Sequence, residues 1–295
     1  MTAFALTLVL AAAVLHATWN LCAKRAGGGL PFVWVVGAVI CTLYLPVLAG
    51  YWLWRQPDLS WSAVAWIAGS GVLKTGYSLF LQRGYRIGDF SLIYPLARGT
   101  GPLLSTLAAI AILGERPSAL AIAGGLVIVV AVFALTGGFE LGRNASASSP
   151  EKRRATTLAL RYGVASGLFI AAYTIWDRHG VHARRIPPVI YDAGTAYVML
   201  ALVTPFALPR WPEVTRHWRE HKRYIFGMAL LSPVAYVLVL TAMSFTPVSY
   251  ITPAREVSIV IGAFIGARYL KEADGRRRLW AALAMTLGVI ALALG

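Results

Sequence analysis

Long apolar stretches recur from one end of the chain to the other, separated by short polar segments. Each stretch is about 20 residues long, enough for an α-helix to cross a hydrocarbon core of roughly 30 Å. Apolar runs bounded by charges, prolines and glycines predict spans at residues 3–23, 31–53, 61–82, 90–113, 118–137, 156–177, 188–208, 224–245, 248–270 and 277–294. The pattern therefore predicts an all-α integral membrane protein of about ten transmembrane helices.

The composition agrees with a membrane environment. Of the 295 residues, 58% are hydrophobic and only 13% are charged, whereas a soluble domain carries about 25% charged residues. The net charge of +15 could indicate nucleic acid, but the Lys and Arg residues lie in short loops between apolar runs. Anionic lipid and membrane topology account for basic residues in such loops. We therefore expect the lipid bilayer as a partner and no nucleic acid.

The chain offers little for metal or cofactor chemistry. Cys22 and Cys41 are the only cysteines, and neither has a partner at ligand-like spacing, so both are interpreted as small core residues. We expect no metal and no cofactor. The first apolar run has no basic residue before it and is followed by Lys24 and Arg25, which favours a retained helix over a cleaved signal peptide.

The chain divides into two similar halves. Residues 138–155 are polar and have linker chemistry, which separates a first five-span repeat at 1–137 from a second at 156–295. At offsets of 157 or 158, Trp19, Asn20, Ser91, Ile93, Pro95, Arg98 and Glu115 fall over Trp176, Asp177, Ser249, Ile251, Pro253, Arg255 and Glu272. Because five spans is an odd number, the second repeat must be inverted. Inverted repeats place a substrate site near the membrane midplane at their interface.

Four motifs are specific enough to suggest a family: "LHATWN" from Leu15, "GDFSLIYPLARGTGPLL" from Gly88, "LGERP" from Leu113 and "PVSYITPAREVS" from Pro247. With them, nearly the whole chain resembles the EamA-type ten-helix carriers of the drug/metabolite transporter superfamily. The resemblance implies a secondary carrier without an ATPase domain. Many of these carriers export amino acids, other metabolites or toxic compounds. We expect a multi-pass protein of a bacterial-type inner membrane.

The charge distribution and the family habit disagree on orientation. Loops after odd-numbered spans contain 18 Lys or Arg residues and the opposite loops contain 5. The positive-inside rule therefore places both termini outside, whereas the family usually has them in the cytoplasm. We follow the charge count, because Lys24 and Arg25 beside the first helix agree with it.

Ionisable side chains at membrane depth are the first candidates for function, because each is unfavourable by about 2.5–3.5 kcal/mol at a helix centre. The candidates are His16, Lys74, Arg98, Asp177, Asp192, Arg255 and Glu256. We predict that Arg98 and Arg255, assisted by Lys74, bind an anionic substrate group. The alternatives are a structural ion pair, for example between Glu256 and Arg98, and a solvated helix end for Asp177. Asp192 could likewise sit at the entrance of the seventh span.

Two aromatic and polar faces extend this set. His16 and Asn20 are four residues apart on one helical face, with Trp19 beside them. That face either binds a polar ligand or makes an interhelical contact. In the second repeat, Tyr173 and Trp176 precede Asp177. They either line a cavity or belong to an interfacial aromatic belt.

Prolines and glycines add further expectations. Tyr94 precedes Pro95 and Thr252 precedes Pro253, and local unwinding at such prolines would create a polar binding surface. Tyr77, Tyr94 and Tyr236 complete the predicted substrate-binding side chains. The pairs Gly163/Gly167 and Gly262/Gly266 are expected to pack helices.

Glu115 and Glu272 recur at the same place in the two halves, each in a segment that connects helices. We expect capping or ion pairing there rather than proton coupling. The leading hypothesis for the chain is a carrier that exports or exchanges a small polar metabolite, such as an organic anion, by alternating access. A proton or a counter-substrate would couple the transport. The rivals are a membrane-embedded enzyme and a receptor or assembly factor, but the short loops hold no zinc motif, nucleophile elbow or kinase motif. No enzymatic activity is expected.

Overall fold

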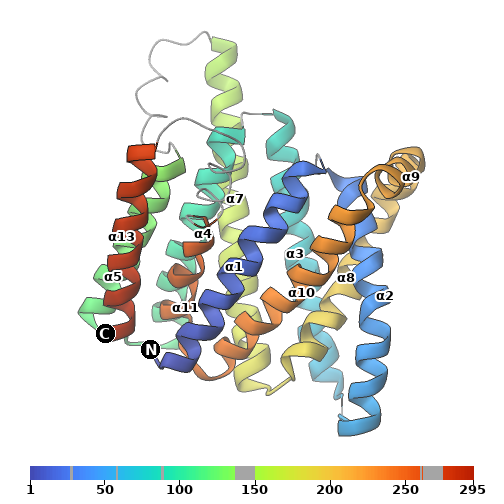
Figure 1. Ribbon diagram of the computed structural model, residues 1–295, viewed down its shortest axis with the longest axis horizontal. Helices are drawn as coiled ribbons and strands as arrows, with labels where there is room; N and C mark the ends of the chain where they lie inside the picture. Colours follow the sequence, from blue (N-terminus) through green and yellow to red (C-terminus); the bar gives the residue numbers. More distant parts are fainter. Residues whose placement is uncertain (27–28, 58, 88–89, 137–149, 260, 262–274) are drawn as a thin grey trace. The chain divides into compact units, whose positions relative to one another are not determined.

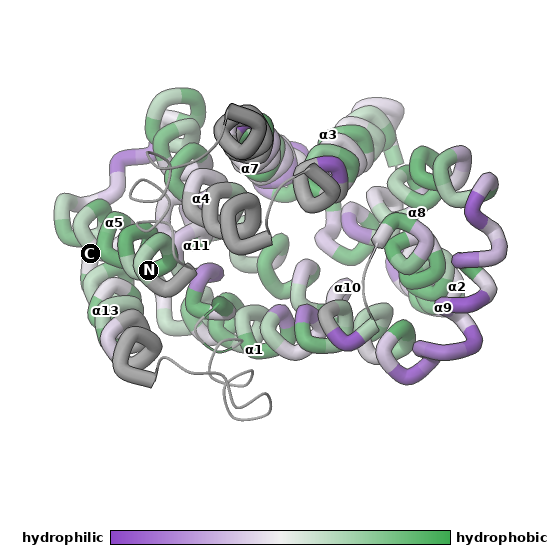
Figure 2. The backbone as a smooth tube through the Cα atoms, turned by 90° about the horizontal axis from the view of Figure 1, so that it is seen from above, coloured by the Kyte–Doolittle hydropathy of each residue, from purple (hydrophilic) through white to green (hydrophobic). Residues whose placement is uncertain are grey.

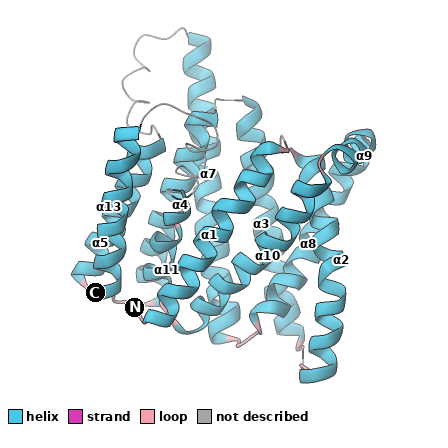
Figure 3. Cartoon of the chain, viewed as in Figure 1, coloured by secondary structure: helices cyan, strands magenta, loops and turns pink. Residues whose placement is uncertain are grey.

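The computed structural model describes the chain apart from residues 27–28, 58, 88–89, 137–149, 260 and 262–274 (Figure 1). The described residues are helical throughout, with no strand among them (Figure 3). The α-helices are α1 Ala3–Arg25, α2 Leu30–Arg55, α3 Trp61–Ile87, α4 Phe90–Leu113, α5 Ala119–Thr136, α7 Pro150–Arg178, α8 Pro188–Ala207, α9 Trp211–Glu220, α10 Lys222–Phe245, α11 Val248–Arg255 and α13 Gly275–Leu294. A π-helix η2 (His179–Ala183) follows α7, and a short 3₁₀ turn η3 (Leu208–Arg210) follows α8.

The described residues place a helix at each of the ten expected spans, five in each half of the chain. Helix α7 begins at Pro150, several residues before the expected start at residue 156. Among the described residues, the π-helix η2, the 3₁₀ turn η3 and the short helix α9 were not predicted. A ten-residue polar helix is too short to cross a bilayer, so a search for apolar runs passes over α9.

Length and composition support membrane insertion. Among the described residues, Ala3–Ala23, Leu30–Arg55, Pro188–Glu220 and Lys222–Phe245 contain windows long and apolar enough to span, and Thr100–Leu113, Ala119–Ala134 and Leu283–Leu294 are shorter apolar helices. Large apolar side chains also face outward, with Leu53 exposed by 84% and Ile112 by 72%. Such a surface is compatible with lipid rather than with water. The chain is a multi-pass membrane protein.

The helices form two compact units, and neither unit is one sequence repeat. Unit 1 contains residues 1–10, 76–175 and 246–295, and unit 2 contains residues 11–75 and 176–245. Helices α3 and α7 each cross from one unit to the other, at Thr75–Gly76 and at Ile175–Trp176. Each unit is therefore built from segments of both halves of the sequence.

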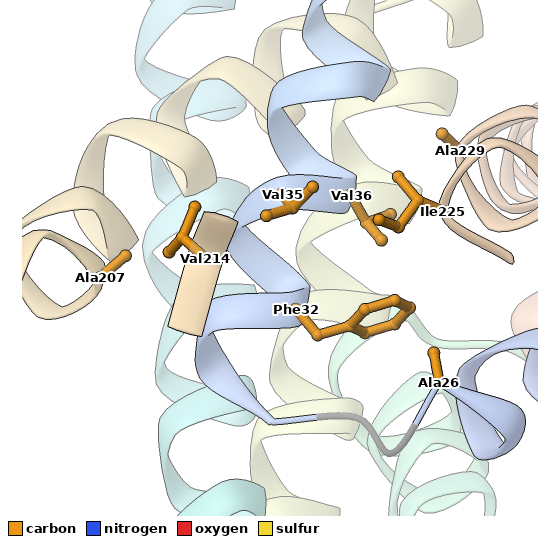
Figure 4. Close-up of a cluster of buried hydrophobic side chains, with 8 residues drawn as sticks. All are labelled: Ala26, Phe32, Val35, Val36, Ala207, Val214, Ile225 and Ala229. Atoms are coloured by element: carbon orange, nitrogen blue, oxygen red, sulfur yellow. The ribbon is translucent and has the colours of Figure 1, made fainter. Parts of the chain in front are cut away.

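One end of unit 2 is held by an apolar cluster (Figure 4). Phe32, Val35 and Val36 of α2 meet side chains from four other segments. These are Ala26 after α1, Ala207 at the end of α8, Val214 of α9, and Ile225 and Ala229 of α10. The cluster gathers the ends of α1 and α8 and the starts of α2 and α10 at one end of the unit.

Small residues bring helices close in unit 1. A Cβ built on Gly124 of α5 would lie 2.6 Å from the carbonyl oxygen of Gly288 in α13, so only glycine fits there. A Cβ on Gly167 of α7 would lie 2.0 Å from the hydroxyl of Thr100 in α4. The predicted packing role is thus confirmed for Gly167, whereas Gly262 and Gly266 lie outside the described residues.

Candidate functional site

A buried ion pair lies in unit 2. The Lys74 ammonium of α3 and the Asp177 carboxylate of α7 are 3.1 Å apart, and their side chains are 11% and 0% exposed. Lys74 therefore does not extend to the protein surface. The alternative in which Asp177 sits at a solvated helix end is wrong, because η2 continues the chain past Arg178 and the Asp177 side chain is fully buried.

Two phenols complete the surroundings of Asp177. The Tyr191 hydroxyl of α8 donates to one carboxylate oxygen at 2.9 Å, and the Tyr236 hydroxyl of α10 donates to the other in a short hydrogen bond. The Lys74 ammonium also lies 4.1 Å from the centre of the Tyr236 ring, a cation–π contact. Asp177 thus joins four helices through one ion pair and two hydrogen bonds to an ionised acceptor, the stronger class of hydrogen bond.

A second carboxylate lies near this pair. Asp192 is in the second turn of α8, close to the start of the seventh span as expected. The Tyr44 hydroxyl of α2 donates to it at 2.6 Å. The charges of Lys74 and Asp177 act on Asp192, so the three ionisable groups form one electrostatic cluster. This "Asp177 cluster" comprises Lys74, Asp177 and Asp192 with their phenol partners Tyr44, Tyr191 and Tyr236.

An aromatic layer adjoins Asp177. The Trp176 indole donates to the backbone carbonyl of Trp66 at 2.8 Å, and the two rings lie 4.1 Å apart. The Trp66 ring also stacks with the His179 ring, with centroids 4.5 Å apart. Gly69 makes room for this layer, because a Cβ there would lie 2.4 Å from the Trp176 ring. These contacts pack α7 against α3, and the substrate-binding role of Trp176 stays a prediction.

Arg178 is a buried cation one residue beyond the predicted span at 156–177. It ends α7, and its guanidinium donates to the backbone carbonyl of Met243 in α10. The structure also adds Tyr44, Trp66 and Tyr191. Only Tyr191 carried a sequence signal, its position next to Asp192 in an apolar run.

The predicted face of α1 makes local contacts. The Asn20 side-chain amide donates to the His16 carbonyl of the same helix at 2.7 Å, and the His16 and Trp19 rings meet edge to face at 4.7 Å. All three side chains are half-buried in unit 2. These contacts are within α1, and they leave both predicted roles of this face, ligand binding and an interhelical contact, as predictions.

The remaining predicted residues belong to unit 1. Tyr77 and Tyr173 approach with ring centroids 6.0 Å apart. Helix α11 ends at Arg255, two residues after Pro253, and the chain turns at Glu256, which is 3% exposed. In contrast, α4 stays helical from Phe90 to Leu113 through Pro95. The side chains of Tyr94 and Arg98 lie outside the described part of the chain.

Glu115 caps the helix that carries Arg255. Its two carboxylate oxygens accept the backbone N–H groups of Val248 and Ser249 at 2.8 and 2.9 Å. Gly114, at φ 68°, provides the left-handed turn that ends α4 immediately before Glu115. The predicted capping role is confirmed, and the cap joins the first sequence repeat to the second. Its counterpart Glu272 lies outside the described residues.

The structure thus divides the predicted site residues between the units. Unit 2 holds His16, Trp19, Asn20, Lys74, Trp176 and Tyr236, and it brings the last three around Asp177. Unit 1 holds Tyr77, Tyr94, Arg98, Tyr173, Arg255 and Glu256. One central cavity bordered by both sets stays a prediction.

Comparisons with known proteins agree with this architecture. One solved crystal structure of a protein is similar over 98% of both chains, with a TM-score of 0.74 and 18% sequence identity, which shows a shared fold. No curated protein matches the chain in sequence. The EamA-like transporter family matches residues 3–137 and again residues 157–294, once in each repeat. The chain is therefore a non-enzymatic membrane transporter and belongs to the EamA-like transporter family.

Proposed function

We propose that this carrier exports or exchanges a small polar metabolite with an anionic group, by alternating access. The observation that carries the proposal is the buried Lys74–Asp177 ion pair. A lysine ammonium removed from water needs an anion beside it. A substrate carboxylate or phosphonate has the charge to take the place of Asp177 at Lys74.

Two tyrosines lower the free-energy cost of such an exchange for Asp177. When the carboxylate gives up Lys74, the hydroxyls of Tyr191 and Tyr236 still donate to its two oxygens. A carboxylate that keeps two hydrogen bonds is far less unfavourable than a bare buried charge. Competition between substrate and Asp177 for Lys74 would then link substrate binding to rearrangement of α3 against α7.

The charges of the Asp177 cluster also suggest why transport would be coupled to a proton or a counter-substrate. With a substrate anion bound, the Asp177 cluster would contain one ammonium, two carboxylates and the anion. A buried excess of negative charge is strongly unfavourable, so a proton or an exchange with a counter-substrate would accompany transport. Arg98 and Arg255 remain candidate ligands for the anionic group on the basis of their matched positions in the repeats. We place the carrier in a bacterial-type inner membrane.

Counterflow in liposomes tests the proposal. The purified chain, reconstituted with an unlabelled metabolite inside, is assayed for uptake of labelled carboxylates, phosphonates, amino acids and amines. We expect counterflow of anionic members, its loss in Lys74→Gln, and its retention in Arg55→Gln, which changes an exposed cation at the end of α2. Flux of cationic members alone would reject the anionic class. A folded protein with no flux of any member would favour a receptor or assembly role.

A further inference from the structure

Helix α9 interrupts the series of membrane spans. It occupies Trp211–Glu220 between α8 and α10, both of which are apolar helices. Ten residues of α-helix extend about 15 Å, half of the hydrocarbon thickness. In Figure 1, α9 is seen nearly end-on, whereas α2 and α10 run along the plane of the picture. A short amphipathic helix that links two spans and turns away from their direction is suited to the membrane boundary.

The faces of α9 differ in chemistry. Trp211, Val214 and Trp218 are three and four residues apart and form one stripe. Val214 is 3% exposed and packs in the apolar cluster of unit 2. Trp211 and Trp218 remain 47% and 39% exposed although they touch Trp34 and Phe226. Partly exposed tryptophans beside an inserted apolar stripe suit the interfacial layer, where indole rings prefer to lie.

Basic residues border this stripe. Residues 210–223 include Arg210, Arg216, Arg219, Lys222 and Arg223 but only two acidic residues, Glu213 and Glu220. Arg216 and Arg219 are three residues apart and exposed on α9, and Glu213 and Glu220 lie three residues before and four residues after Arg216, beside it on the helix surface. Among the described residues, the ion pairs take up neither arginine. In Figure 2, hydrophilic colour marks this stretch next to α2.

His217 adds little charge to α9 at neutral pH. Burial and the neighbouring His221 and Arg216 lower the pKa of His217. The positive potential of α9 therefore comes from side chains that stay protonated at any cellular pH, mainly arginines. The positive-inside count assigns this end of the unit to the cytoplasmic leaflet, which is rich in anionic lipid.

We propose that α9 lies in the headgroup layer and binds an anionic phospholipid, with Arg216 and Arg219 on the phosphate and Trp218 at the acyl boundary. Arginine suits a phosphate because its planar fork donates two parallel hydrogen bonds. Lys222 reinforces the site from the first turn of α10, where its ammonium lies 5.7 Å from the Trp218 ring. The bound lipid would fix α9, and through Val214 the apolar cluster, against the membrane.

Thermal unfolding of the purified full-length chain in neutral detergent tests this site. The probes are mixed micelles with phosphatidylglycerol, mixed micelles with phosphatidylcholine, and free glycerol phosphate. A ligand that binds only the folded state raises the unfolding midpoint. We expect phosphatidylglycerol to raise it by a few degrees, in a salt-sensitive way, and the other two probes to leave it unchanged.

The variants decide whether α9 is responsible. Arg216→Gln/Arg219→Gln should lose most of the phosphatidylglycerol effect, and Arg216→Lys/Arg219→Lys should keep much of it. Arg55→Gln/Arg185→Gln removes the same charge from the opposite end of unit 2 and should respond like the wild type. An equal response of the Gln pair and the wild type, or no phosphatidylglycerol response at all, would overturn the proposal. A midpoint shift with glycerol phosphate alone would instead indicate a site for a soluble anion.

Discussion

Asn20 and Asp177 occupy matching positions in the two sequence repeats, each directly after a tryptophan, yet their surroundings differ. In α1, the Asn20 amide donates to a carbonyl of its own helix, one turn earlier. In α7, Asp177 binds Lys74 of α3 and accepts from Tyr191 of α8 and Tyr236 of α10. A neutral side chain is matched with a local contact and a charged one with a contact to three other helices.

Solvation explains the difference. A half-buried amide can satisfy one donor within its own helix, at small cost. A carboxylate with no exposed surface needs a counter-charge and hydrogen-bond donors, and one helix cannot supply them. The two matched positions therefore differ by one functional group, with a local contact in α1 and a four-helix network in α7.

The largest expected effect comes from making α7 resemble α1. Asp177→Asn keeps the shape of the side chain but removes the counter-charge of Lys74. Breaking a buried ion pair from one side costs about 3–5 kcal/mol. We expect a fall of that size in the free energy of unfolding, measured by denaturant titration in detergent, with a lower thermal midpoint.

A double variant checks the cause of that loss. Lys74→Met/Asp177→Leu removes both charges of the pair and should recover part of the stability lost by Asp177→Asn, because the Lys74 ammonium is no longer left without Asp177. It should still lack transport. If Asp177→Asn proves as stable as the wild type, the ion pair is not what holds α3 to α7.

Glu115 and Glu272 are matched positions at which both repeats have a carboxylate. Glu115→Gln retains one acceptor but loses the charge at the N-terminus of α11. Hydrogen bonds to charged groups are worth about 1.5–3 kcal/mol, so we expect a loss of about 2 kcal/mol. Hydrogen exchange of the Val248 and Ser249 amides should accelerate. Arg116→Gln, beside it and exposed, serves as the control and should leave both amides protected.

Asn20→Asp reverses the comparison by making α1 resemble α7. The added carboxylate would be half-buried and would lose the amide donor now bonded to His16. We expect a loss of about 1.5 kcal/mol, which is typical of a polar group buried without its partner. Denaturant titration at neutral and acidic pH measures it, and protonation of the new carboxyl should restore part of the stability. A variant more stable than the wild type would show that a cation lies within reach.

The smallest effect should separate the two matched tryptophans. Trp176→Phe loses the hydrogen bond to the Trp66 carbonyl, whereas Trp19 has a ring contact with His16 that a phenyl ring can retain. One hydrogen bond contributes about 1 kcal/mol, so Trp176→Phe should be less stable than Trp19→Phe by about that amount. Equal thermal midpoints for the two variants would show that the α7 tryptophan acts only through its apolar area.

Span positions could be predicted from sequence because each depends on local composition. The free energy of transferring a helix to lipid depends on the residues of that helix alone, so apolar runs were enough to predict the ten helices. The capping role of Glu115 was also predictable, since an acidic residue in a helix-connecting turn is favoured near helix N-termini. The helix that it caps was not, because Val248 and Ser249 lie more than a hundred residues further along the chain.

The candidate site shows the same limit. Lys74, Trp176 and Tyr236 were selected from sequence because charged and aromatic groups are rare at membrane depth. Nothing in the local pattern distinguishes Tyr44 or Trp66 from other aromatics in apolar runs, although both contact the candidate site. Arg178 lies just outside the predicted span at 156–177, because the continuation of α7 into a π-helix has no signature in the composition.

The sequence by itself determined the membrane class, the duplication, the family and the charged residues that need explanation, because transfer of side chains to lipid is a property of each residue and its neighbours. Only the tertiary structure decided that Asp177 pairs with Lys74, that Glu115 caps α11, and that each unit combines segments from both repeats. These contacts join residues far apart in the chain. Their partners are selected by which helices pack together, and that depends on the fit of all their side chains at once.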